Sequence, residues 1–240
     1  MSTAPEISDP EPAHVYIVRR TVEACHMAKE AAGAAAEGIA TGSSQLLNSL
    51  RQRERQLDTL DLEIDSGVTT AITEVGPAEA RELLACMKVM IALERIGDLL
   101  LSFGNSALSV NGRIDSEDSR DLTQMATLLE KMLTDSAAAF SGRDVAKAID
   151  VLRADAEMDR MRNLIFLRHI ENPENAHRQA SLQVIFMTQS LERAGDHAKN
   201  LAEEVCHFVS GRAVRHVSIA YNKPVEQMFI DYLRGRDPKH

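Results

Sequence analysis

Two short segments of the sequence carry paired carboxylates at the spacing of one helical turn. Residues 93–98 read LERIGD and residues 191–196 read LERAGD, so five of six positions are identical. The pairs are Glu94 with Asp98 and Glu192 with Asp196. On a helix, residues four apart share one face, with Cβ atoms about 5–6 Å apart. Buried acids must be paired or coordinate a metal, so the chemistry indicated is the binding of a cation.

Further acids precede each motif. Glu54 and Asp58 lie upstream of the first motif, and Asp155 and Asp159 lie upstream of the second at an offset of 101 residues. If the helices that carry them pack side by side, each half of the chain brings four carboxylates together. The candidate metal ligands are therefore Glu54, Asp58, Glu94, Asp98, Asp155, Asp159, Glu192 and Asp196. Such oxygen-rich sites suit Mg²⁺, Mn²⁺ or iron, and zinc stays open as well.

A solvated acidic face is the competing explanation for either pair taken alone. Recurrence of the pair in two halves, with acids recurring upstream, favours the metal site. The second pair shares its helix stripe with Lys199 and Glu203, so we expect it to be the more exposed of the two.

The apolar residues around these acids repeat as well. Leu50, Leu57 and Ile64 are spaced by seven residues, and Val151, Met158 and Ile165 follow the same spacing at the offset of 101. Two halves of three helices each, related by an internal repeat, are the economical interpretation. Gly97 and Gly195 interrupt predicted helices within the motifs, and we expect either a neighbouring helix or the other ligands of a metal to approach closely there.

Six long helical patterns fill the chain between turn residues. They are expected at about 13–38, 44–75, 78–110, 117–140, 143–171 and 174–210. Helices of this length need neighbours of similar length, as in a bundle. The predicted fold is all-α, with two tandem three-helix bundles. Its parts are an arm at 1–12, a first bundle at 13–112, a second at 113–212 and a tail at 213–240.

The composition limits the kinds of fold and partner that are expected for this protein. The chain of 240 residues has 27 basic and 36 acidic side chains, a net charge of −9, which opposes binding to a nucleic-acid backbone. Aromatic residues make up 4% of the chain and Trp is absent, which disfavours a β-sandwich. The three cysteines form no CxxC motif, and no apolar stretch is long enough to span a membrane. We therefore expect a soluble, cytoplasmic protein.

The paired LERIGD and LERAGD motifs on six long helices resemble the PhoU family, the accessory regulators of bacterial phosphate uptake. The resemblance covers about residues 13–216, and the family's E(D)xxxD metal-binding motifs match all four acidic pairs. It implies a homodimeric, cytoplasmic, metal-binding protein that is not an enzyme. It also implies action with a phosphate ABC transporter and a sensor histidine kinase, at the membrane periphery, to keep phosphate-starvation genes off when phosphate is plentiful.

The second half differs from the first at one position near these acids. Asp61 in the first half corresponds to Arg162 in the second. A basic residue removes a possible ligand there, so the second site is expected to hold fewer ions or to bind them more weakly.

Two other functions compete with this interpretation. A ferritin-like di-iron enzyme would use Glu-x-x-His pairs, and the chain contains two, Glu23 with His26 and Glu204 with His207. These pairs do not correspond between the halves. A metal-free helical adaptor, stabilised by packing alone, is the other alternative.

Overall fold

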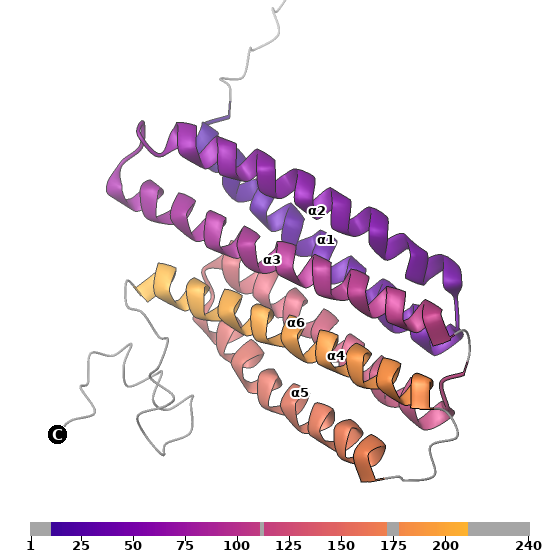
Figure 1. Ribbon diagram of the computed structural model, residues 1–240. Helices are drawn as coiled ribbons and strands as arrows, with labels where there is room; N and C mark the ends of the chain where they lie inside the picture. Colours follow the sequence, from indigo (N-terminus) through magenta and orange to yellow (C-terminus); the bar gives the residue numbers. More distant parts are fainter. Residues whose placement is uncertain (1–10, 111–112, 172–177, 211–240) are drawn as a thin grey trace, which may run out of the picture.

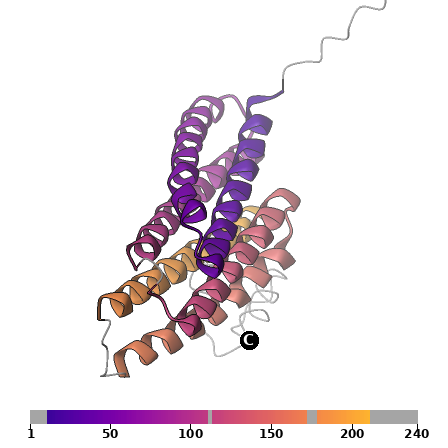
Figure 2. The same cartoon turned by 90° about the vertical axis from the view of Figure 1, so that its right-hand side faces the viewer.

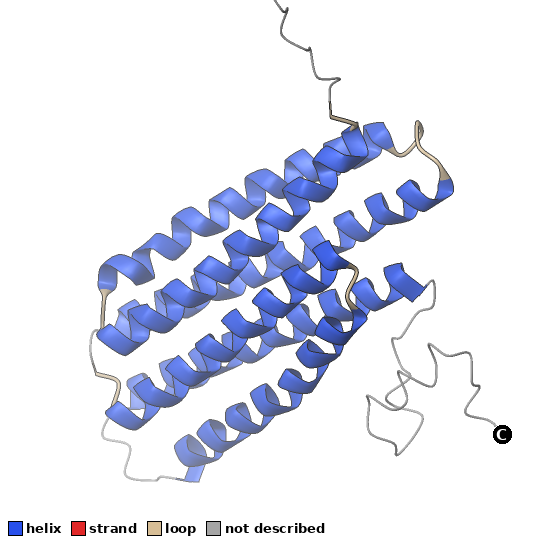
Figure 3. Ribbon diagram, turned by 180° about the vertical axis from the view of Figure 1, so that it is seen from behind, coloured by secondary structure: helices blue, strands red, loops and turns tan. Residues whose placement is uncertain are grey.

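The computed structural model describes residues 11–110, 113–171 and 178–210. Within these ranges the chain forms six α-helices and no strand, as Figure 3 shows from behind. The helices are α1 (Ala13–Thr41), α2 (Ser44–Ala71), α3 (Pro77–Val110), α4 (Ser116–Gly142), α5 (Val145–Glu171) and α6 (Arg178–Ser210). The predicted all-α fold is confirmed. The predicted arm at 1–12 and tail at 213–240 lie almost wholly outside the described residues.

Local sequence signals explain where three of the helices begin. Ser43 caps α2 by accepting a hydrogen bond from the backbone N–H of Leu46 at 3.4 Å. Pro77 occupies the first position of α3, where its missing N–H costs nothing. Asp115 caps α4 by accepting a hydrogen bond from the N–H of Asp118 at 2.8 Å.

Two predicted helix ends are wrong. The first helix does not stop at Gly38 but runs to Thr41, and Gly42 ends it with a φ of 68°. Gly38 is buried, and a Cβ there would lie 2.8 Å from Leu47 Cδ2, so this glycine serves the packing of α2 against α1. The second helix ends at Ala71, four residues before the predicted Val75. The start predicted near 174 lies outside the described residues.

The six helices form two layers (Figure 1). Helices α2, α3, α6 and α5 lie next to one another in that order, and α1 and α4 pack behind them. Figure 2 shows the three helices of the first half stacked on the three helices of the second half. The halves meet where α3 packs on α6 and α1 packs on α4, so a single apolar core runs through both. No described helix is long and apolar enough to cross a membrane.

The glycine of the first motif lies at a close contact between α2 and α3. A Cβ on Gly97 would be 3.0 Å from Leu57 Cδ1 and 3.8 Å from the Cα of Glu54. In the second half, a Cβ on Gly195 would be 3.2 Å from Met158 Cγ. Leu57 and Met158 are counterparts in the repeat, so the predicted close approach is confirmed in both halves.

A buried ion pair ties the start of α4 to the end of α5. Asp118 is 3% exposed and accepts hydrogen bonds from Arg168 Nη2 at 2.6 Å and from His169 Nε2 at 3.0 Å. His169 Nδ1 lies 2.7 Å from the hydroxyl of Ser181, which extends the link to α6. Burial acts to raise the pKa of Asp118, but the bonds from His169 and Arg168 outweigh it and lower that pKa.

We expect Gly97→Val to destabilise the protein by about 1–3 kcal/mol, because the added methyl groups overpack the α2–α3 contact. Gly33→Val is the matched control, since the three atoms nearest to a Cβ on this α1 glycine all belong to the movable carboxylate end of Glu130. Chemical denaturation should show the loss for Gly97→Val and a much smaller change for Gly33→Val. Equal losses would contradict the close contact.

We expect Asp118→Asn to cost about 2 kcal/mol of unfolding free energy at neutral pH, through the loss of charge-assisted hydrogen bonds. Because the folded pKa is lowered, this stabilisation is present above the pKa of the unfolded chain. It is lost as the pH falls through the folded value. Urea melts at a series of pH values should therefore show wild type and variant converging below about pH 4. A difference that stays constant down to acid pH would contradict the lowered pKa.

Candidate functional site

The eight predicted ligands lie on the layer formed by α2, α3, α6 and α5. The first carboxylate group consists of Glu54 and Asp58 on α2 with Glu94 and Asp98 on α3. The second carboxylate group consists of Asp155 and Asp159 on α5 with Glu192 and Asp196 on α6. Each group therefore spans two helices that pack side by side, as the repeat predicts.

Acids of the first carboxylate group act on one another across the two helices. Burial, followed by the charges of Asp58 and Asp98, raises the pKa of Glu54. Burial and Asp98 raise the pKa of Glu94, and Asp58 on the opposite helix adds to the effect. Because α2 packs against α3, carboxylates on the two helices lie near enough to repel one another.

Asp61 adds a fifth carboxylate to the same region. Burial and the charges of Asp65 and Asp58 raise its pKa, and Asp61 in turn acts on Glu94. It lies one helical turn after Asp58, half-buried beside the α2–α3 seam. The sequence points to this residue through its stripe with Asp58, although it lies outside the two paired motifs.

The arginine of the first motif contacts this group from its exposed side. Arg95 is 58% exposed, with its guanidinium 3.3 Å from Glu94 and 3.5 Å from Asp98. Exposed ion pairs of this kind contribute little to stability. Arg95 therefore leaves most of the negative charge of the group uncompensated.

The second carboxylate group contains its own cation. Lys199 Nζ on α6 donates a hydrogen bond to Asp155 Oδ2 on α5, and the Asp155 side chain is only 8% exposed. Sequence reasoning places Lys199 on the stripe but misses this pairing. Asp196 is more exposed than its counterpart Asp98, as expected of the second pair, and Glu192 is half-buried like Glu94. Asp155, which is not part of that pair, is buried.

Arg162 lies at this group too. Burial and Asp196 raise the pKa of Glu192, and the charge of Arg162 opposes them. The Arg162 guanidinium also lies 5.8 Å from the ring of Phe166, further along the α5–α6 seam. The basic residue that replaces Asp61 in the repeat is therefore near enough to act on the second group.

The carboxylates do not converge on a single point. Among the described residues, no three His, Cys, Asp or Glu side chains are arranged to hold a metal ion. The donor chemistry of the first carboxylate group does fit a hard cation, because its acids repel one another and no lysine joins them.

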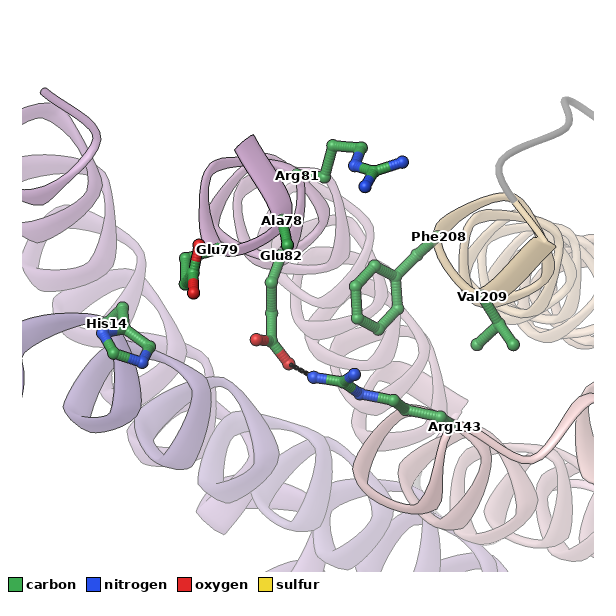
Figure 4. Close-up of a pocket in the computed structure, with 8 residues that line it drawn as sticks. All are labelled: His14, Ala78, Glu79, Arg81, Glu82, Arg143, Phe208 and Val209. Carbon is green, nitrogen blue, oxygen red and sulfur yellow. Dashed lines mark hydrogen bonds and ion pairs between the residues drawn. The ribbon is translucent and has the colours of Figure 1, made fainter. Parts of the chain in front are cut away.

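A pocket of about 670 Å³ lies apart from both groups (Figure 4) and is lined by none of the eight acids. Residues from α1, α3 and α6 line it together with Arg143, which ends α4. Arg143 donates a hydrogen bond to Glu82 at 2.8 Å and lies 5.2 Å from the ring of Phe208. These contacts tie the two halves together, which is a structural role.

Known proteins share both the sequence pattern and the fold. The PhoU domain model matches residues 21–106 and 122–205. A phosphate-specific transport system accessory protein PhoU homolog from Pseudomonas aeruginosa is 28% identical, over 79% of this chain and 80% of that protein. A protein of the same description from Caulobacter vibrioides is 31% identical, over 71% and 76%.

Solved structures agree in fold. The crystal structure of PhoU from Pseudomonas aeruginosa has a TM-score of 0.76 at 24% identity, covering 83% of this chain and 99% of that one. The phosphate transport system regulatory protein PhoU from Streptococcus pneumoniae has a TM-score of 0.77 at 19% identity, covering 84% and 97%. Both copies of the PhoU domain coincide with the two halves that carry the carboxylate groups, and this chain belongs to the PhoU family.

Proposed function

We propose that the protein is an accessory regulator of a phosphate transport system. It represses the phosphate-starvation response when phosphate is plentiful and modulates phosphate uptake. The observation that carries this proposal is the pair of PhoU domains, each with its motif acids on a helix that packs against the preceding helix. Relatives that match most of this chain are described as phosphate-specific transport system accessory proteins.

The proposed partners follow from the same family. They are the cytoplasmic side of a phosphate ABC transporter and a sensor histidine kinase, with the protein acting as a homodimer in the cytoplasm, peripheral to the membrane. Nucleic acid is not among them, because a net charge of −9 opposes the phosphate backbone. A regulator of this kind acts by docking, which requires no catalytic residue.

We further propose that the first carboxylate group binds a metal ion. Glu54, Asp58, Glu94 and Asp98 supply only carboxylate oxygens, the ligands preferred by Mg²⁺, Mn²⁺ and iron. The raised pKa values of Glu54 and Glu94 support the proposal, because bringing these acids together costs free energy that a cation would offset. When bound, the metal would supply positive charge that joins α2 to α3.

The di-iron enzyme has less support. Glu23 pairs with Arg20 on its own helix, and Glu204 pairs with Lys88 on α3 at 2.9 Å. These two glutamates are thus engaged in ion pairs and lie on α1 and α6 respectively. A metal-free adaptor remains the main alternative, and metal analysis of protein purified without chelators separates it from the metal-binding regulator.

Metal should stabilise the wild-type protein more than the double variant that carries both Glu94→Ala and Asp98→Ala. Without metal, this double variant should be neutral or slightly more stable, because repulsion is removed and Ala favours the helix. A cation that binds only the folded state adds about 2.7 kcal/mol at a hundredfold excess over Kd. Thermal melts of chelator-treated protein with and without Mn²⁺ measure the difference, and Glu37→Ala, at an exposed acid on α1, is the control. Equal shifts in wild type and double variant would rule out this metal site.

Deleting the gene should release repression of phosphate-starvation genes in medium rich in phosphate. Phosphatase activity of the deletion strain, compared with the same strain carrying the wild-type gene, measures this effect. Repression that persists in the deletion strain would remove the proposed regulatory role, whatever the result of the metal experiments.

A further inference from the structure

The buried acid of the second carboxylate group is neutralised from within the protein. Asp155 on α5 forms its ion pair with Lys199, which reaches across from α6. The Asp155 side chain is 8% exposed and the Lys199 side chain 36% exposed, so this ion pair lies largely removed from water.

The first carboxylate group has no such cation. Lys199 lies seven residues after Glu192, and the residue at that distance from Glu94 is Leu101. Asp61 likewise stands where the second half has Arg162. Across these six corresponding positions the first half has five acids and no base, whereas the second has four acids and two bases.

Other cations near the first group do not replace Lys199. Arg51 and Arg55 lower the pKa of Glu54 by their charge, but both are exposed and belong to the same helix as Glu54. Arg95 is exposed as well and pairs with acids of its own motif. Among side chains that the structure describes, no Lys or Arg forms an ion pair between α2 and α3.

We propose that the two halves balance their carboxylates by different means, so that Lys199 and Arg162 keep divalent metal out of the second group and only the first group takes it up. Lys199 is then the residue that determines which half binds metal. This inference rests on the proposed binding of metal by the first carboxylate group.

Electrostatics explains why the lysine excludes a divalent ion. A metal that used Asp155 would have to displace the ammonium group from a nearly buried carboxylate. The lysine would then lie beside a second cation, partly removed from water, and both effects are unfavourable. Leu101 presents no such obstacle in the first half.

Counting bound Mn²⁺ tests the proposal. Full-length protein is stripped with chelator and titrated with Mn²⁺, and the free ion is measured by electron paramagnetic resonance. Glu94→Gln with Asp98→Asn should abolish tight binding in the otherwise wild-type chain. Lys199→Leu, which introduces the residue found at position 101, should increase bound Mn²⁺ about twofold by opening the second group.

Two further variants test whether the additional Mn²⁺ binds at the second carboxylate group. Adding Glu192→Gln and Asp196→Asn to Lys199→Leu should remove the extra Mn²⁺. Lys88→Leu is the matched control, because it breaks another lysine–carboxylate pair between helices, the one with Glu204, and should gain no Mn²⁺. Without metal, Lys199→Leu should lower Tm because Asp155 loses its partner, and Mn²⁺ should restore it.

The possible failures are distinguishable. If Glu192→Gln with Asp196→Asn halves the Mn²⁺ bound by the otherwise wild-type chain, both groups bind metal and the inference is wrong while metal binding stands. If the Glu94→Gln and Asp98→Asn variant retains half of its Mn²⁺, the inference is wrong in the same way, even if Lys199→Leu does not fold. If the wild type binds no Mn²⁺, the metal-binding part of the proposed function fails together with the inference.

Discussion

The close packing of each motif glycine against the preceding helix is the contact on which both carboxylate groups depend. Leu57 and Met158 seat the motif glycines against the preceding helix, and this contact fixes how near the acids of the two helices come. The apolar seam that builds each bundle therefore also creates an electrostatic cost. In the second half Lys199 supplies positive charge at that seam, whereas the first half has Leu101 at the corresponding position.

Helix positions follow from the sequence because their causes are local. Pro77, the hydroxyl of Ser43 and the seven-residue spacing of Leu50 and Leu57 act within one or two turns. The sequence wrongly predicts a helix end at Gly38, because this glycine makes room for a side chain of another helix, Leu47 of α2. A glycine signals a helix end and a close contact equally well, and only the neighbour decides between them.

In the candidate site too, features with a local cause are predictable from the sequence and contacts between helices are not. The internal repeat is enough to pair Glu54 and Asp58 with the first motif, since an offset shared by apolar and acidic residues implies a shared arrangement. Polarity along one helix cannot show that Lys199 turns towards α5 and buries Asp155. Long side chains reach partners on other helices, so the sequence predicts which helices carry charge better than it predicts how that charge is paired.

Charge alternates across the face that carries both carboxylate groups. Where α3 meets α6, burial and the charge of Arg193 lower the pKa of His197, and Arg95 from α3 adds to that effect. Positive side chains at this seam thus separate the acids of α2 and α3 from those of α5 and α6. Because α3 packs on α6, the two carboxylate groups lie on the same face of the molecule. Without positive side chains between them, these two groups would repel each other. The arginine inside each motif places a positive charge between the two acidic groups, which gives its recurrence an electrostatic reason even though the ion pairs of Arg95 are exposed and weak.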